Sequence, residues 1–340
     1  MEKASINNAL NIVKGIACIF VVLMHCEFPG KFGVLVQCVS RFAVPFFFAV
    51  SGYFCFYPDD KKLGQRLPFK IKHIAHITLA SCGVYIIWFI IKIITGVVVV
   101  PPELTWWKHV LMLVLFNQPL LISGHLWFLF ALLYAYILMS VVYKNVGLNS
   151  RYLPIVICIL LIMYFAISYG AYLSGIDIPN CIYRNFLFEG FPLMLLGYYF
   201  HKNQEQLLEG ITDVKICALL FIGIALSVTE RWLLGRDFGM HAGSILTLLA
   251  LLYLSVQNSG TERLKTFRIL GEKYSLWVYV AHMLVWDVVY KVAEQLHCSE
   301  NAVFLWIQPI VVVASTIISG IIFYWIKDRL KDCHEYKYSK

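Results

Sequence analysis

Long apolar runs separated by short polar segments recur along the whole chain. Each run is close to the roughly 20 residues that a helix needs to cross the hydrocarbon layer of a bilayer. The runs are continuously apolar and do not alternate, which favours helices over a transmembrane β-barrel. We therefore predict an all-α, polytopic membrane bundle with about ten transmembrane helices. The predicted spans are 9–27, 36–57, 73–95, 125–143, 152–173, 186–201, 214–232, 241–257, 274–291 and 303–326.

One further apolar segment, residues 105–121, is too short to cross a bilayer comfortably. We expect it to form an interfacial or re-entrant helix. No polar segment is long enough to build a second core, so we predict a single membrane domain over residues 1–340. No internal repeat is evident, which weakens an inverted-repeat transporter interpretation.

The composition agrees with this picture. The 340 residues are 60% hydrophobic and only 14% charged, with ten cysteines and a formal net charge of +8. The cysteines are scattered singly without a CxxC pair, so neither a disulfide scaffold nor a metal site is predicted. The positions of the Lys and Arg residues along the chain indicate which partners the positive charge serves.

The loops on one side of the predicted bundle carry about three times as many Lys and Arg residues as those on the other. Since positive residues accumulate on the cytoplasmic side, we predict a multi-pass protein of the inner or plasma membrane with both termini in the cytoplasm. The expected partner of the basic loops is the anionic lipid of the bilayer or an anionic cofactor. A nucleic-acid partner is not expected.

The first span contains two ionisable side chains, Lys14 and His25. A spacing of eleven residues returns to nearly the same helix face about 16 Å further along the axis. Polar side chains in a membrane helix suggest function, because burying them in lipid costs free energy. Lys14 would suit a phosphate arriving from the cytoplasm, and the His25 imidazole would suit proton abstraction. The alternative is that Lys14 reaches to the cytoplasmic surface and His25 lies in the opposite headgroup layer.

A second group of polar residues could receive a nucleotide-like cofactor. Arg41 lies within the outer third of the second span and needs an anionic or carbonyl partner. Ser51 precedes a glycine inside an aromatic helix, which suits either a ligand or close helix packing. Basic residues then follow in the loop before the third span. Ordinary membrane anchoring explains them, and the functional alternative is a mouth that collects the cofactor's phosphates. They are Lys61, Lys62, Arg66 and Lys70.

Four residues in later spans are candidates for substrate binding. His125 and Trp127 suit a sugar-binding rim or an aromatic belt at the membrane surface. Glu189 lies early in a span, where an interfacial ion pair is the alternative. His282 lies in the middle of an apolar span and should face the bundle interior, either supporting the cavity or taking part in the chemistry.

Four further segments with a characteristic sequence follow the Lys14–His25 pair along the chain. These are VPFFFAVSGYF (44–54), HLWFLFALL (125–133), GFPLMLLGYYF (190–200) and SLWVYVAH (275–282). Together they resemble the integral-membrane acyltransferase family called acyltransferase 3, over nearly the whole chain. Lys14 replaces the commoner arginine, a variation that the family pattern accepts.

The resemblance implies a ten-helix bundle that moves acyl groups, usually acetyl, from cytoplasmic acyl-CoA to hydroxyls of surface glycans or glycolipids. It implies that His25 is the essential residue, as general base or transient acyl carrier, and that Lys14 assists at the CoA end. No metal is expected, and no oligomeric state follows. The alternatives are a transporter or flippase for lipid-linked sugars and, third, a membrane scaffold.

Overall fold

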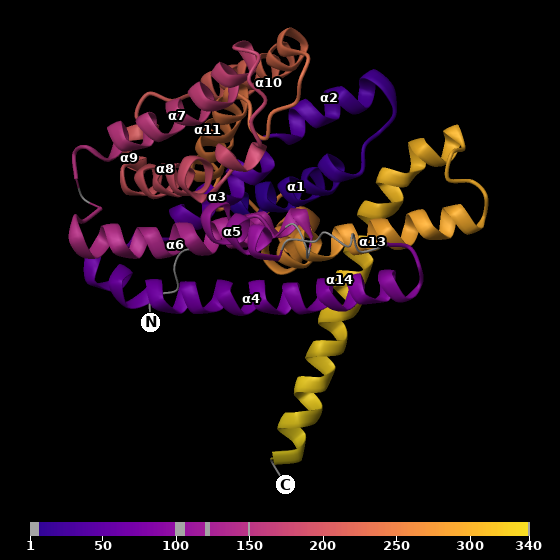
Figure 1. Ribbon diagram of the computed structural model, residues 1–340. Coiled ribbons are helices and arrows are strands. Elements are labelled where there is room, and N and C mark those ends of the chain that lie inside the picture. The colour runs from indigo at the N-terminus through magenta and orange to yellow at the C-terminus, as the bar shows by residue number, and fades with distance from the viewer. Residues whose placement is uncertain (1–6, 99–105, 120–122, 149, 339–340) are drawn as a thin grey trace. The chain divides into compact units, whose positions relative to one another are not determined.

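The computed structural model describes residues 7–98, 106–119, 123–148 and 150–338, and within these ranges every regular element is a helix. The helices are labelled in Figure 1. They pack into two units. Residues 1–43 and 249–340 form the first unit, and residues 44–248 form the second. The predicted all-α bundle is therefore confirmed.

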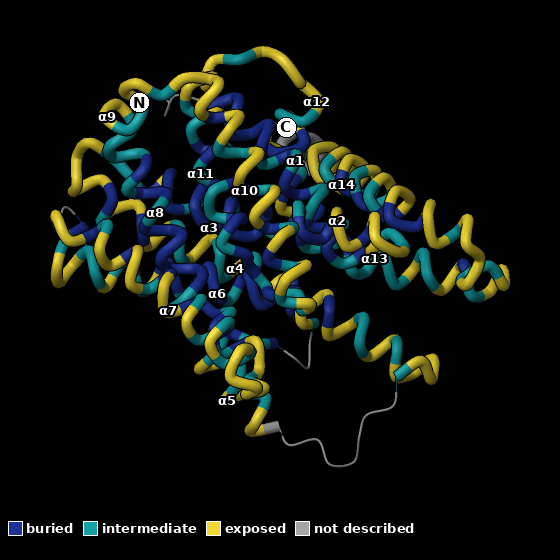
Figure 2. Tube along the Cα trace, turned by 90° about the horizontal axis from the view of Figure 1, so that it is seen from above, coloured by how far each residue is buried: buried dark blue, intermediate teal, exposed yellow. Residues whose placement is uncertain are grey.

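The first unit is built around α1. Its neighbours within the unit are α2, α12, the π-helix η4, α13 and α14, and α13 also packs on α14. Most residues of α1 are buried, as its dark colour in Figure 2 shows. The elements of this unit are α1 (Asn8–His25), α2 (Gly30–Ser40), the end of α11 (Ala242–Gln257), α12 (Lys265–Ile269), η4 (Leu270–Tyr274), α13 (Ser275–Gln295) and α14 (Ala302–Tyr338).

Helix α1 begins and packs for identifiable reasons. The side-chain oxygen of Asn7 accepts the backbone N–H of Leu10 at 2.8 Å, which is an ordinary N-cap. Further along, Gly15 lies against the backbone of Phe267, and Gly271 lies against the carbonyl oxygen of Asn11. A Cβ atom at either glycine would come within 2.1 Å of those oxygens. The sequence therefore permits a backbone-to-backbone crossing between α1 and the α12–η4 segment.

The second unit packs α4 against α6, and packs α7 and α8 around the π-helix η3. Two glycines of the aromatic motifs, Gly52 of α3 and Gly197 of α8, allow another close crossing, since each faces a backbone carbonyl of the other helix. The elements are α3 (Ala43–Tyr53), α4 (Asp60–Ile94), α5 (Trp106–Phe116), η1 (Gly124–Leu126), α6 (Trp127–Asn145), α7 (Leu153–Leu173), η2 (Asn180–Ile182), η3 (Phe186–Gly190), α8 (Phe191–Lys202), α9 (Gln204–Leu208), α10 (Asp213–Leu234) and the start of α11.

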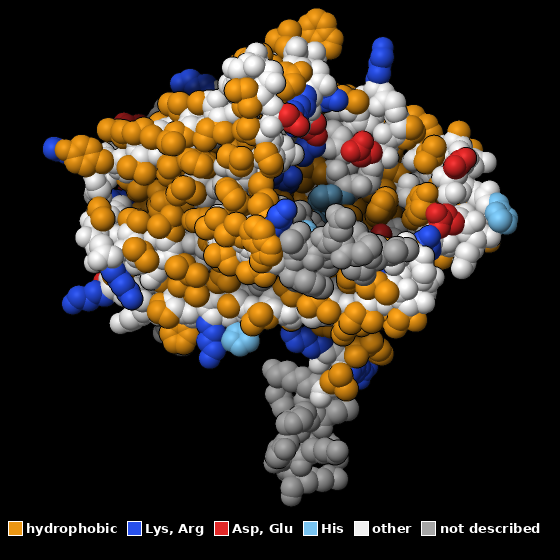
Figure 3. Space-filling view, in the orientation of Figure 1, with side chains coloured by type: hydrophobic (Ala, Val, Ile, Leu, Met, Phe, Trp, Pro, Cys, Tyr) orange, Lys and Arg blue, Asp and Glu red, His pale blue; other side chains and the backbone are white. Residues whose placement is uncertain are grey.

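Eight helical stretches in the described ranges are long and apolar enough to cross a membrane. The predicted span 36–57 overlaps one of them, Gly30–Tyr53, and extends four residues beyond its end. A turn at residues 41 and 42 divides this stretch into α2 and α3. The predicted spans 186–201 and 241–257 are also helical but shorter: the first combines η3 with α8, and the second is α11. On the face drawn in Figure 3, hydrophobic side chains cover much of the surface, as expected for a chain that contacts lipid.

Two segments differ in detail from the sequence-based expectation. The basic segment before residue 73 is helical and not a loop, because α4 begins at Asp60 and continues through Pro68 to Ile94. Hydropathy marks where a helix enters lipid, and a helix can continue into water. The apolar segment 105–121 contains the eleven-residue helix α5, whose length fits the prediction of a non-spanning helix. Residues 105, 120 and 121 of that segment lie outside the described ranges.

Candidate functional site

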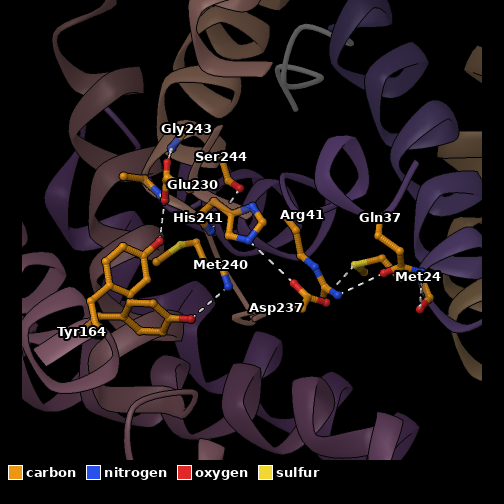
Figure 4. A network of polar contacts seen from close by, with 12 residues as sticks. Met24, Gln37, Arg41, Tyr164, Glu230, Asp237, Met240, His241, Gly243 and Ser244 are labelled. Carbon is orange, nitrogen blue, oxygen red and sulfur yellow. Dashed lines mark hydrogen bonds and ion pairs between the residues drawn. The ribbon is translucent and has the colours of Figure 1, made fainter. Parts of the chain in front are cut away.

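His25 is the last residue of α1 and is half-buried. The end of this helix is held by Gln37 of α2, whose side-chain Nε2 donates to the carbonyl oxygens of Leu23 at 3.1 Å and Met24 at 3.0 Å. Helix C-terminal carbonyls lack intrahelical partners, so Gln37 stabilises the turn that carries His25. Figure 4 shows Gln37 beside Met24.

Arg41 extends the same arrangement. Its Nη2 donates to Oε1 of Gln37 at 3.0 Å, and its Nη1 lies 3.8 Å from the sulfur of Met24 (Figure 4). The guanidinium group of Arg41 thus holds the Gln37 side-chain amide in the position where it caps the end of α1. Sequence analysis treated Arg41 as a cofactor contact and overlooked Gln37. A glutamine within an otherwise apolar span was the available signal for that residue.

His282 is positioned by its own helix. The side chain is only 1% exposed, and its Nδ1 lies 2.7 Å from the carbonyl oxygen of Tyr279 and 3.1 Å from that of Val278. A carbonyl oxygen can only accept, so Nδ1 must carry a proton. In the neutral ring the lone pair therefore resides on Nε2.

The fold brings His25 and His282 together. Their ring centroids are 5.1 Å apart, and the ring planes are inclined by 39°. The two residues are more than 250 positions apart in the sequence, yet both belong to the first unit. Two of the three histidines that the sequence singled out inside spans thus form one pair of imidazoles. Such a pair can hold, donate or accept a proton.

Lys14 lies on α1 beside the glycine crossing. Its neighbour in the chain is Gly15, which packs against η4, and the side chain is half-buried. The carboxylate of Glu272 in η4 is close enough to interact electrostatically with the Lys14 ammonium group. The crossing therefore places a cation and a carboxylate beside each other, about 16 Å along the helix from His25.

Ser51 and the basic residues of α4 belong to the second unit. The Ser51 hydroxyl donates to the carbonyl oxygen of Phe47 at 2.8 Å and is hydrogen-bonded to Tyr136. The ammonium nitrogen of Lys70 lies 5.9 Å from the centre of the Tyr136 ring. Three helices thus contribute to one cluster of side chains, made of Ser51, Tyr136 and Lys70.

The other basic residues of this segment, Lys61, Lys62 and Arg66, are exposed on the first turns of α4. Residues four positions apart share a helix face, so Lys62, Arg66 and Lys70 form one row. We call this row the α4 basic face. It could hold phosphate groups, since each side chain is a charged donor.

His125 and Trp127 are both buried. His125 contacts the Ser123 hydroxyl through Nδ1 at 2.8 Å and meets the ring of Tyr85 edge-on at 4.8 Å. The guanidinium carbon of Arg184 lies 4.4 Å from the centre of the Trp127 ring. Arg184 therefore covers one face of the indole, the surface on which the sequence interpretation would place a sugar.

Glu189 lies in the π-helix η3 and is 1% exposed. The side-chain oxygen of Asn185 accepts the backbone N–H groups of Leu187 and Phe188, which fixes the start of this element. Short π-helices occur frequently at functional sites. In the preceding segment, burial raises the pKa of Tyr183, although the positive charges of Arg236 and Arg184 act in the opposite direction.

A buried carboxylate elsewhere in the second unit has a structural role. Glu230 accepts the backbone N–H groups of Ala242 at 2.9 Å and Gly243 at 2.8 Å, and it also accepts the Tyr169 hydroxyl. These contacts cap the amino end of α11 (Figure 4). In the part of the chain that the structure describes, no group of three or more His, Cys, Asp or Glu side chains could hold a metal ion.

A comparison with protein-family models identifies the family of the chain. A family model described as an acyltransferase domain, that of the acyltransferase 3 family, matches residues 7–325. No curated protein and no solved structure matches the chain. The matched range contains both histidines, Lys14 and the whole α4 basic face. The chain therefore belongs to the acyltransferase 3 family and is a membrane acyltransferase.

Proposed function

We propose that this protein transfers an acyl group, most simply acetyl, from cytoplasmic acyl-CoA to a hydroxyl of a surface polysaccharide or related glycan. The observation that carries the proposal is the contact between His25 and His282 in a chain that belongs to an acyltransferase family. An imidazole is suited to this reaction because it takes up and releases protons near neutral pH.

The proposed reaction uses His25 in one of two ways. As general base, its lone-pair nitrogen accepts the proton of the acceptor hydroxyl while the oxygen attacks the thioester carbonyl carbon. The carbon–sulfur bond then breaks, and CoA leaves as the thiol after taking the proton from His25. As acyl carrier, the same nitrogen attacks the thioester carbonyl carbon first, the carbon–sulfur bond breaks, and CoA leaves as the thiolate. The acceptor oxygen then attacks the acyl carbon, the carbon–nitrogen bond to the imidazole breaks, and the acceptor's proton passes through His25 to the CoA thiolate.

The proposed donor contacts are cationic. In the first unit, Lys14 is the proposed contact for a phosphate of acyl-CoA. In the second unit, the α4 basic face and Lys61 are the cationic candidates for phosphate binding. Ser51 belongs to the same proposal, because its hydroxyl lies beside Tyr136 and thus on the Lys70 side of the second unit. Arg41 acts in this scheme through Gln37, by holding the end of α1 on which His25 lies.

The proposed acceptor contacts are those that the sequence singled out for a glycan. His125, Trp127 and Glu189 are assigned to the acceptor because histidine and carboxylate groups bind hydroxyls and an indole packs on sugar C–H groups. Arg184, which lies over Trp127, joins this set. An acceptor would then have to share the indole with the guanidinium.

A transfer assay with purified protein tests the proposal. Labelled acetyl-CoA and the host's surface glycan are supplied to the wild type and to His25→Ala. We expect ester-linked label on the glycan with the wild type, and a loss of about 10²–10⁴-fold in the variant, as for the removal of a general base. A rapid denaturing quench at neutral pH without acceptor separates the two routes, because only the acyl-carrier route leaves label on the protein.

Normal transfer by a folded His25→Ala protein would remove His25 from the reaction. Movement of a lipid-linked sugar across liposomes in the absence of acyl-CoA would instead support the flippase alternative.

A further inference from the structure

The placement of His282 goes beyond what acyl transfer by a single histidine requires. A buried histidine in the middle of an apolar helix is costly unless its polar atoms are satisfied. Here the cost is partly met by the main chain of α13, since Nδ1–H donates to Tyr279. The ring, however, packs against His25 and not against apolar side chains alone.

We propose that His282 is the positioning residue of the catalytic histidine: anchored through Nδ1 to the turn Val278–Tyr279, its ring fixes the orientation of the His25 imidazole. This inference rests on the proposed function of His25. It assigns His282 to the reaction without giving it direct contact with either substrate, whereas the sequence placed it among the substrate-binding residues.

The anchor restricts His282 in two ways. Contacts of 2.7 Å and 3.1 Å with two successive carbonyl oxygens oppose rotation of the ring, because any large rotation would break both. The same contacts keep a proton on Nδ1 and thus fix which tautomer the neutral ring adopts. The His282 side chain is 1% exposed. Taking up a second proton would give it a buried positive charge, which costs free energy.

A fixed neutral ring is useful beside a catalytic imidazole. At a centroid distance of 5.1 Å it limits the rotamers open to His25, which ends α1 and is only half-buried. Because it stays neutral, it does not oppose the positive charge that His25 acquires when it takes a proton. The capping of α1 by Gln37 fixes the backbone of the same turn, so side chain and backbone are held by separate contacts.

Two substitutions at His282 separate the anchor from the ring. His282→Phe keeps an aromatic ring against His25 but loses the bond to Tyr279. His282→Asn retains a donor close to the position of Nδ1 but loses the ring. We expect both to lower kcat by about 10²-fold, as small misplacements of catalytic groups do, and to leave the KM for acetyl-CoA unchanged.

The matched control is His201→Phe in the second unit. His201 makes the same kind of contacts, with Nδ1 2.7 Å from the carbonyl oxygen of Tyr53 and its ring stacked on the Tyr53 ring at 3.9 Å. We expect this change to lower thermal stability and to leave kcat at the wild-type value. Melting temperatures with and without acetyl-CoA show whether each variant is folded.

Wild-type kcat in a folded His282→Phe or His282→Asn protein would overturn the inference, as would a change confined to KM, which would instead indicate donor binding. Should the Phe variant fail to fold, the smaller Asn variant decides by the same criteria. If the wild type itself transfers no acyl group, the proposed function fails. If only the role of His282 is wrong, the wild type is active and His25→Ala is not.

Discussion

The surroundings of Lys14 in the structure decide how this lysine is interpreted. Alone, a lysine near the end of a membrane helix could simply reach the surface. In the structure it stands at a close helix crossing with Glu272 beside it. An ammonium group held at this crossing can bind a phosphate group.

Replacing this cation is therefore expected to weaken donor binding more than the chemical step. For Lys14→Ala we expect the KM for acetyl-CoA to rise by about tenfold or more, since a hydrogen bond to a charged group contributes about 1.5–3 kcal/mol. Lys14→Arg should preserve most of the affinity because the charge remains. Initial rates over a range of acetyl-CoA concentrations give the comparison.

The control is Lys273→Ala, because Lys273 is an exposed cation that pairs with Asp328 on α14 at 3.6 Å. Its removal should not change the KM. An unchanged KM in Lys14→Ala would exclude Lys14 from the donor site.

The sequence predicted Lys14, His25 and His282 as polar groups inside spans, because each breaks an apolar pattern. It could not predict that two of them touch, since contacts between residues more than 250 positions apart depend on how helices pack. Gln37 was missed for a related reason. Its role depends on two carbonyl oxygens at the end of another helix.

At the scale of elements, the crossing of α1 with the α12–η4 segment is the feature most open to test. A Cβ atom at Gly271 would lie 1.9 Å from the carbonyl oxygen of Asn11, so the helices would have to separate. We expect Gly271→Ala to lower stability by about 1–3 kcal/mol, the usual cost of overpacking. Since Lys14 lies at this crossing, the KM for acetyl-CoA should rise as well.

Gly83→Ala is the matched control for this change. Gly83 lies within α4, and nothing stands within 4 Å of the Cβ atom that would be added. Alanine there should stabilise the helix by about 0.5–1 kcal/mol, because glycine loses more conformational entropy on folding. Thermal unfolding in detergent compares the two proteins. Equal melting temperatures would show that the crossing tolerates a methyl group.

Helices were predictable as apolar runs, but their ends and interruptions were not. Hydropathy located the span 36–57 without the turn at residues 41 and 42, because both sides of the turn are apolar. It also began the third span at residue 73, whereas α4 begins at Asp60. The π-helices η3 and η4 leave no trace in hydropathy, since they change hydrogen bonding and not composition.

At the scale of the molecule, composition was enough to predict the fold class. A chain that is 60% hydrophobic and 14% charged has too few charges to cover a water-soluble surface of its size. The partition into units was not predictable in this way. The first unit joins residues 1–43 to residues 249–340, so it unites the two ends of the chain. Because the two terminal segments pack together, His25 lies beside His282.

The charge asymmetry of the loops yields a prediction about sidedness. If the α4 basic face and Lys14 point toward the cytoplasm, acyl-CoA, which does not cross a bilayer, must be supplied from that side. Right-side-out membrane vesicles should therefore transfer label only when acetyl-CoA is loaded inside, and inverted vesicles should use acetyl-CoA added outside.

A cysteine-reactive, membrane-impermeant probe reports the orientation independently, through a single cysteine introduced at Lys62 in a cysteine-free background. Labelling of Lys62→Cys in inverted vesicles only, together with the matching donor requirement, is the expected result. Labelling from the opposite side would reverse the topology, and with it the assignment of Lys14 to the donor end of α1.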